Sequence, residues 1–87
     1  MASYKVELKR SAEKELRALP NKELLRIVEA IKSLADEPRP NGCKKLSGEE
    51  KYRLRVGNYR ILYQIEDDVL VVYVVKVGHR RDVYEKK

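Results

Sequence analysis

The sequence predicts a single α+β domain in which a two-helix hairpin packs on a small sheet. The chain has 87 residues, which is below the size at which chains divide into several cores. Apolar residues recur at helical spacing in the first half. In the second half they alternate with polar residues or form an apolar run. We therefore expect one domain over residues 1–87, in the order strand, helix, helix and three-stranded antiparallel meander.

The first strand is expected over residues 4–8, where apolar and polar side chains alternate. Ser11 then stands where the N-cap of a helix would, with acidic residues in the turn that follows. A stripe at helical spacing gives this first helix one apolar face to bury. The stripe consists of Ala12, Leu16 and Leu19.

Pro20 and Asn21 interrupt the first helix, and a second helix is expected over residues 22–35. Its outer face carries charges of both signs, which is typical of a solvated surface. Residues 36–42 contain two prolines and a glycine and therefore predict a loop. The apolar face of the second helix comprises Leu24, Ile27, Val28, Ile31, Leu34 and Ala35.

A period-two pattern over residues 51–56 and 59–65 predicts two antiparallel strands. Gly57 and Asn58 lie between them as a two-residue loop. Glycine occupies the first central position, as a type II′ turn requires. This pair of strands is therefore expected to form a tight hairpin.

The last strand is expected over residues 69–77, after an acidic turn at residues 66–68. This run is apolar and rich in β-branched residues, which is typical of a strand at the centre of a sheet. Gly78 is expected to end it.

The composition favours an anionic partner and argues against a metal or a cofactor. Lys and Arg number 20 against 14 Asp and Glu, a net charge of +6, which suggests nucleic acid first and a membrane surface or an acidic protein second. One cysteine, Cys43, and one histidine exclude a disulfide framework and a multi-cysteine zinc site. No apolar run approaches the ~20 residues of a membrane span. Charged residues also interrupt the N-terminus where a signal peptide would be apolar. We expect a cytoplasmic protein.

The hairpin register groups several arginines. A two-residue loop places Arg55 directly opposite Arg60, with Arg53 two residues further along the same exposed face. Opposed like charges destabilise a sheet by some tenths of a kcal/mol, and no acidic residue occurs between Lys51 and residue 65 to offset them. A bound phosphate would account for this arrangement, because guanidinium groups fork onto phosphate oxygens. The alternative is a solvated outer face.

The C-terminal tail adds candidates for proton transfer and for anion binding. Arg80 and Arg81 follow the last strand, which in a meander runs beside the strand that bears Arg60. His79 and Tyr84 lie in the same segment. Cations stabilise a tyrosine phenolate and so make it a better base. The alternatives are a surface histidine and a packing tyrosine.

Other chemistries have little support. The carboxylate pairs at residues 36–37 and 67–68 fall in turn signals, where Asp is favoured for backbone reasons. The sequence contains no glycine-rich phosphate loop and no zinc spacing. Cleavage of a phosphodiester would then proceed without a metal. That favours RNA as the substrate, because its 2′-hydroxyl is a built-in nucleophile.

The run KKLSGEEKYRLRVGNYRILYQIEDDVLVVYVVKVGHRRDVY resembles the RelE/ParE superfamily of prokaryotic toxins, in particular its RelE-like branch. The pattern consists of K-L-x-G, then Y-R-L-R-x-G-x-Y-R-I-x-Y, then V-x-x-V-G-H-R-R-x-x-Y. The upstream A-x-K-x-L and I-x-x-x-I-x-x-L-x-x-x-P also fit it, so the resemblance covers nearly the whole chain.

The resemblance implies a RelE-like fold and the toxin of a type II toxin–antitoxin system. Such a toxin enters the ribosomal A site and cleaves mRNA there without metal, by 2′-hydroxyl attack. A cognate antitoxin protein blocks it, and operator DNA is bound only through the antitoxin complex. The implied catalytic residues are Arg53, Arg55, Arg60, Arg80 and Tyr84. His79 is a further catalytic candidate because of its place in the tail, and the candidate RNA-binding residues are Lys44, Lys45, Lys51 and Arg81.

Two departures from the family pattern affect which residue could act as the general base. The prototype of the family has lysines at the positions of Arg53 and Arg55, and it has a further arginine where Ser47 stands here. Arginine does not give up its proton at working pH, so His79 and Tyr84 are the better candidates for proton transfer. Two other functions stay open, a ParE-like inhibitor of DNA gyrase and a plain nucleic-acid-binding module.

Overall fold

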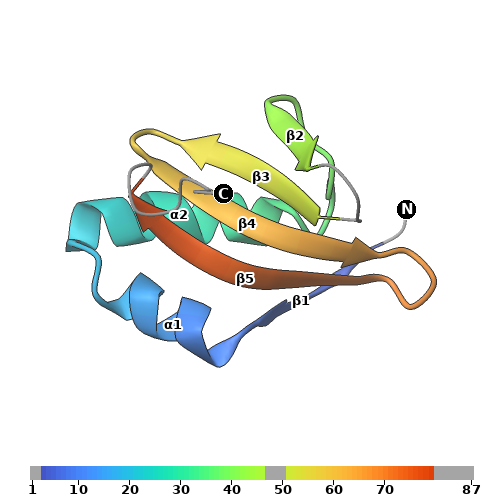
Figure 1. Ribbon diagram of the computed structural model, residues 1–87, viewed down its shortest axis with the longest axis horizontal. Helices are drawn as coiled ribbons and strands as arrows, with labels where there is room; N and C mark the ends of the chain where they lie inside the picture. The colour runs from blue at the N-terminus through green and yellow to red at the C-terminus, as the bar shows by residue number, and fades with distance from the viewer. Residues whose placement is uncertain (1–2, 47–50, 80–87) are drawn as a thin grey trace.

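Two helices cover one face of a five-stranded mixed sheet, as the ribbon diagram shows (Figure 1). The computed structural model describes residues 3–46 and 51–79. The strand order is β1-β5-β4-β3-β2, with β1 parallel to β5 and the other neighbours antiparallel. The predicted α+β class is confirmed. The elements are β1 (Lys5–Leu8), α1 (Arg10–Arg17), α2 (Asn21–Ser33), β2 (Cys43–Leu46), β3 (Lys51–Val56), β4 (Tyr59–Glu66) and β5 (Val71–His79).

The core lies between the helices and the sheet. Both helices contribute at the spacing predicted from the sequence, and the strands contribute every second residue until a bulge in the β4–β5 pairing shifts the alternation. Neither helix in the described part of the chain is long and apolar enough to cross a bilayer. The buried apolar side chains are Ala12, Leu16, Ile27, Ile31, Leu34, Tyr52, Leu54, Ile61, Tyr63, Ile65, Val72, Val74 and Val77.

Helix α1 begins earlier than predicted. Its N-cap position is Lys9, no side chain caps it, and Ser11 lies inside the first turn. The expectation that Ser11 caps this helix is therefore wrong. The reason lies in the backbone, because the Lys9 amide donates to the Val74 carbonyl and so ends β1 only one residue before the helix.

A carboxylate on α1 continues the edge of β5 where β1 stops. Strand β1 pairs with β5 only as far as Leu8 and Val74. Beyond that point the Val77 amide donates to Glu15 Oε1 at 2.9 Å, and Lys76 Nζ lies 2.9 Å from Glu15 Oε2. An unpaired amide at a sheet edge is costly when it is buried. The Glu15 side chain therefore takes the place of a longer β1.

Relative to the prediction, the structure adds one strand and shifts both ends of β5. The segment Cys43–Leu46 forms an additional edge strand, β2, antiparallel to β3. Strand β5 starts at Val71 and continues through Gly78, so Gly78 does not end it. The preceding turn extends to Leu70, whose φ of 54° is left-handed, because Glu66 pairs directly with Val71.

The hairpin between β3 and β4 has the predicted register. Arg55 faces Arg60 and Arg53 faces Leu62. Gly57 has a φ of 61°, whereas Asn58 is not left-handed, as a type II′ turn requires. The Arg26 guanidinium of α2 lies against this turn, 3.1–3.3 Å from the position that a Cβ on residue 57 would take. Both the left-handed φ and the close contact with Arg26 therefore favour glycine at position 57.

We expect Gly57→Ala to destabilise the fold by about 1–3 kcal/mol, because an L side chain is strained at this φ. Asn58→Ala is the matched control and should cost less. Urea unfolding monitored by circular dichroism measures both. If adding Arg26→Ala restored the stability of Gly57→Ala, then crowding by Arg26 and not backbone strain would be the cause.

Candidate functional site

The sheet face opposite the helices is basic. Directly opposed residues in a sheet point to the same side, so the register gathers cations from three neighbouring strands there. The described strands β2 and β3, and β4 as far as Ile65, contain no acidic residue. We call this surface the basic face, and its residues are Lys44, Lys51, Arg53, Arg55 and Arg60.

Two cross-strand pairs on the basic face bring like charges together. Lys44 of β2 lies opposite Arg53 of β3, and Arg55 of β3 lies opposite Arg60 of β4. Lys44 and Arg55 are exposed, and Arg53 is half-buried. Each such pair costs a few tenths of a kcal/mol, so these pairs do not stabilise the sheet. They provide an array of donors for an anion.

Arg60 is buried, and the expectation that it would be exposed is wrong. Only 6% of its surface is accessible, although its side chain points away from the helices. The reason is its place in the sheet, because β4 has neighbouring strands on both sides and Arg60 lies between Arg55 and Gly78 in the register. Glycine has no side chain, which leaves room beside Arg60. A buried guanidinium is held more rigidly than an exposed one.

His79 lies on the other side of the sheet from the basic face. It pairs with Tyr59, which shares its face with the core residue Ile61, and the two rings meet edge to face with centroids 5.5 Å apart. A recess of about 290 Å³ beside them is lined by α1 residues such as Glu15 and Leu19. The structure therefore does not bring His79 to the predicted cluster.

The remaining candidates divide between the two faces. Lys51 lies opposite Gln64 on the basic face, whereas Lys45 lies opposite Tyr52 and so belongs to the helix side. Candidates outside the described residues are Ser47, Arg80, Arg81 and Tyr84.

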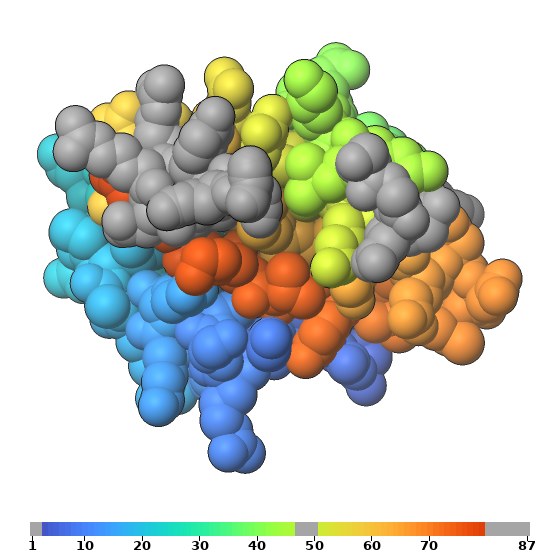
Figure 2. Space-filling model, in the orientation of Figure 1, coloured from blue at the N-terminus to red at the C-terminus, as the bar shows by residue number. Residues whose placement is uncertain are grey.

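An open depression of about 590 Å³ lies at the β2 side of the basic face. Its lining joins strand and loop residues, because Lys44, Arg53 and Arg55 meet Asn41 and Gly42 there. In the space-filling view β2 and the preceding loop stand up beside β3 (Figure 2). The segment that joins α2 to β2 therefore forms one wall of this depression.

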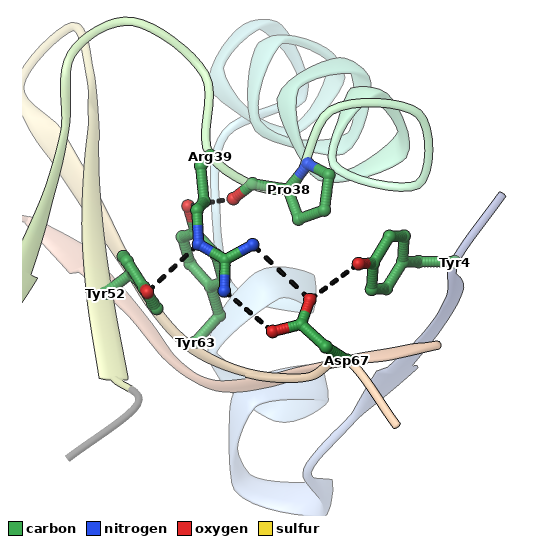
Figure 3. A network of polar contacts seen from close by, with 6 residues as sticks. All are labelled: Tyr4, Pro38, Arg39, Tyr52, Tyr63 and Asp67. Carbon is green, nitrogen blue, oxygen red and sulfur yellow. Dashed lines mark hydrogen bonds and ion pairs between the residues drawn. The ribbon is translucent and has the colours of Figure 1, made fainter. Parts of the chain in front are cut away.

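A polar network fixes that segment (Figure 3). Arg39 donates through Nη2 to Asp67 Oδ2 at 2.9 Å and through Nε to the Tyr52 hydroxyl at 3.1 Å. Its guanidinium also lies over the Tyr52 ring, 5.3 Å from the centroid. The Tyr4 hydroxyl donates to Asp67 Oδ1 at 2.6 Å, and the Tyr63 hydroxyl donates to the Pro38 carbonyl at 2.7 Å. Side chains from three parts of the chain thus converge on residues 38 and 39, and Tyr4 holds one of these side chains, that of Asp67.

The polar groups in this network stabilise one another's protonation states. Hydrogen bonds from Arg39 and Tyr4 keep the pKa of the Asp67 carboxyl below its ordinary value. The same carboxylate raises the pKa of the Tyr4 hydroxyl, and it raises the pKa of Arg39 together with Tyr52. Burial raises the pKa of the Tyr63 hydroxyl. Asp67 therefore stays ionised, and its donors stay protonated, at neutral pH.

The described residues contain no group of three or more His, Cys, Asp or Glu side chains that could hold a metal ion. The functional groups of the basic face are guanidinium and ammonium donors, which can bind a phosphodiester and stabilise added negative charge.

Sequence reasoning missed two features of this site. The pairing of Lys44 with Arg53 depends on β2, a four-residue strand next to a loop signal. Arg39 lies in the stretch that composition predicts to be a loop, and nothing in the sequence links it to Asp67, 28 residues away. The residues Cys43, Lys44, Lys45 and Leu46 do not alternate between apolar and polar, so the sequence carries no period-two signal for β2.

Comparisons with known proteins identify a family that matches nearly the whole chain. The model of the family described as the ParE toxin of the type II toxin–antitoxin system, parDE, matches residues 6–84. Toxin RelG of Mycobacterium tuberculosis is 34% identical over 87 residues, which covers 95% of this chain and 98% of that protein.

Solved structures are similar over nearly the whole chain. The crystal structure of the toxin–antitoxin complex RelBE2 from Mycobacterium tuberculosis gives a TM-score of 0.81 at 34% identity, covering 92% of this chain and 94% of the other. The archaeal RelE–RelB complex from Pyrococcus horikoshii OT3 gives 0.82 at 30% identity, covering 90% and 96%.

We expect Arg60→Ala to lower the free energy of unfolding by about 1–3 kcal/mol, because it removes a buried side chain, and Arg55→Ala to change it by about 0.5 kcal/mol or less. The two residues are directly opposed and chemically identical, so Arg55→Ala is the matched control. Urea titrations measure both. Equal losses would contradict the difference in burial.

Proposed function

The chain belongs to the RelE/ParE superfamily of type II toxins, and from this we propose that it is a metal-independent endoribonuclease that cleaves mRNA in the ribosomal A site. It is a RelE/RelG-like toxin of a type II toxin–antitoxin system. The finer activity rests on the basic face and on the likeness to RelE-type toxins.

One observation carries the proposal. Lys44, Arg53 and Arg55 lie together on one sheet face, and no ion pair links any of them to another described residue. Binding of a polyanion explains such cations without acidic partners better than a contribution to stability does. A single RNA strand can lie along such a face and meet one guanidinium after another.

In the proposed reaction the 2′-oxygen of the RNA attacks the adjacent phosphorus. The P–O2′ bond forms, the P–O5′ bond breaks, and the products are a 2′,3′-cyclic phosphate and a 5′-hydroxyl. A base takes the proton of the 2′-hydroxyl, and an acid returns a proton to the leaving 5′-oxygen. Arg53, Arg55 and Arg60, with Arg80, stabilise the charge that builds on the phosphorane.

We assign the proton transfer to Tyr84 rather than to His79. The ring of His79 packs on Tyr59 at the helix side of the sheet, and a proton-transfer group must reach the reacting hydroxyl to within hydrogen-bond distance. Cations beside Tyr84 would favour its phenolate.

A cognate antitoxin protein is the proposed partner, because the similar structures are complexes of a toxin with its antitoxin. Operator DNA would be bound only through that complex. The proposed compartment is the cytoplasm, where ribosomes are found.

Inhibition of DNA gyrase is the second candidate, because the matching family model describes a ParE toxin. A protein that acts only by binding gyrase has no need of a catalytic array. The buried, oriented Arg60 and the likeness to RelE structures favour the nuclease.

The test is cleavage mapping on translating ribosomes, with a gyrase supercoiling assay in parallel. We expect new 5′-hydroxyl ends within mRNA and unchanged supercoiling. Cleavage of free RNA by the purified toxin should be unchanged by excess EDTA, and a requirement for a specific divalent ion in this ribosome-free assay would contradict the metal-independent mechanism. Loss of supercoiling without cleavage would establish the gyrase function instead.

Tyr84→Phe should lower the cleavage rate by roughly 10²–10⁴-fold, the usual contribution of a general acid or base, and leave RNA binding unchanged. His79→Gln is the comparison and should lower the rate far less. Single-turnover cleavage and RNA-binding titrations measure both. A large effect of His79→Gln together with a small effect of Tyr84→Phe would transfer the role to His79.

A further inference from the structure

The network around Arg39 lies on the path between α2 and β2 (Figure 3). Arg39 is followed by Pro40, Asn41 and Gly42. Strand β2 then begins at Cys43, the residue that precedes Lys44. The Cys43 amide donates to the Pro40 carbonyl at 3.1 Å, so the segment turns sharply into the strand. The position at which Arg39 is held therefore affects the position of Lys44 beside β3.

Four hydrogen bonds hold residues 38 and 39 from outside the segment. Two of them join Arg39 to Asp67, which is the partner most distant in the sequence. Both of its carboxylate oxygens are used, since Arg39 approaches Oδ1 at 3.4 Å and Oδ2 at 2.9 Å, and Tyr4 donates to Oδ1. The fork geometry fixes direction as well as distance. Asp67 and Arg39 are about half exposed, so their attraction is screened and the benefit is mainly in orientation.

Asp67 belongs to the turn between β4 and β5, and its hydrogen bonds go to Tyr4 and Arg39 and not to the described residues of the basic face. The loop that it restrains nevertheless supplies Asn41 and Gly42 to the wall of the depression that contains Lys44, Arg53 and Arg55. Ordering a loop residue costs roughly 1–2 kcal/mol in backbone entropy. A loop ordered in advance does not have to meet this cost when RNA binds.

We infer that Asp67 is a positioning residue, which acts through Arg39 to hold the loop of residues 38–42 so that Lys44 stands beside Arg53 and binds an RNA phosphate. The inference relies on the proposed function only for the identity of the anion.

Asp67→Asn tests it, with Asp68→Asn as the matched control. Asp68 is the next residue in the same turn, and no hydrogen bond or ion pair links it to the described residues. Arg39→Lys is a second variant, which keeps the charge but loses the fork. The exposed position of Asp67 makes loss of the fold an unexpected result, and thermal melting checks it.

The first measurement is the salt dependence of binding to a single-stranded RNA oligonucleotide. Asp67→Asn should make the slope of log K against log salt shallower by about 0.7, the loss of one neutralised phosphate. Lys44→Gln should have the same effect, and the double variant should show no further loss. Asp68→Asn should match the wild type.

The second measurement is the reaction rate of Cys43, the single cysteine of the chain, with a thiol reagent. Cys43 is half-buried at the start of β2, so release of the loop should raise its rate several-fold in Asp67→Asn and Arg39→Lys. This readout requires neither RNA nor ribosomes.

Faster thiol reaction with an unchanged salt slope would overturn the inference, because the network would then hold the loop without positioning Lys44. Equal effects of Asp67→Asn and Asp68→Asn would overturn it too, since turn charge alone would be responsible. A wild-type protein that binds RNA but does not cleave it would refute the proposed nuclease. The comparison of slopes would still decide the role of Asp67.

Discussion

The type II′ turn at Gly57 and Asn58 sets the register of β3 against β4, and most of the molecule follows from that register. A slip by one residue would move every side chain of a strand to the other face. Tyr52 and Leu54 would then leave the core, and the arginines would enter it. The close contact between Arg26 and Gly57 ties the turn to the helix layer as well. Fold and basic face are therefore determined by the same two residues.

The sheet places the apolar core and the proposed binding surface on opposite faces. On the helix side, each fully buried aliphatic or aromatic side chain contributes roughly 1.5–3 kcal/mol. On the other side, opposed cations cost a few tenths of a kcal/mol for each pair. The first quantity exceeds the second many times over, so the core holds the strands together while the repulsion is tolerated. An arrangement that is unfavourable by itself can persist where an anion binds, because the scaffold does not depend on it.

Local patterns predicted most of the fold, and contacts that are distant in the sequence account for what they missed. Alternation and turn chemistry predicted the β3–β4 hairpin with its register, because both signals lie within 16 residues. The burial of Arg60 depends on β5, and the position of His79 depends on its partner Tyr59, so neither follows from its own neighbours in the chain. Strand β2 has four residues and no alternation of apolar and polar side chains, so it does not stand out from the preceding loop. The Arg39–Asp67 pair joins two turns, and its existence depends on the complete fold.

The place of β5 in the sheet has a consequence for the order of events during synthesis. This strand is the last in the described chain, yet it lies between the first strand and β4. Lys5 and Val71 are paired although almost the whole domain separates them along the chain, and such distant pairing slows folding. While a ribosome is still translating the first 70 residues, β1 and α1 have no partner strand to pack against. The nascent chain therefore lacks a complete core until β5 has emerged, and a toxin built in this way cannot fold before that strand is synthesised.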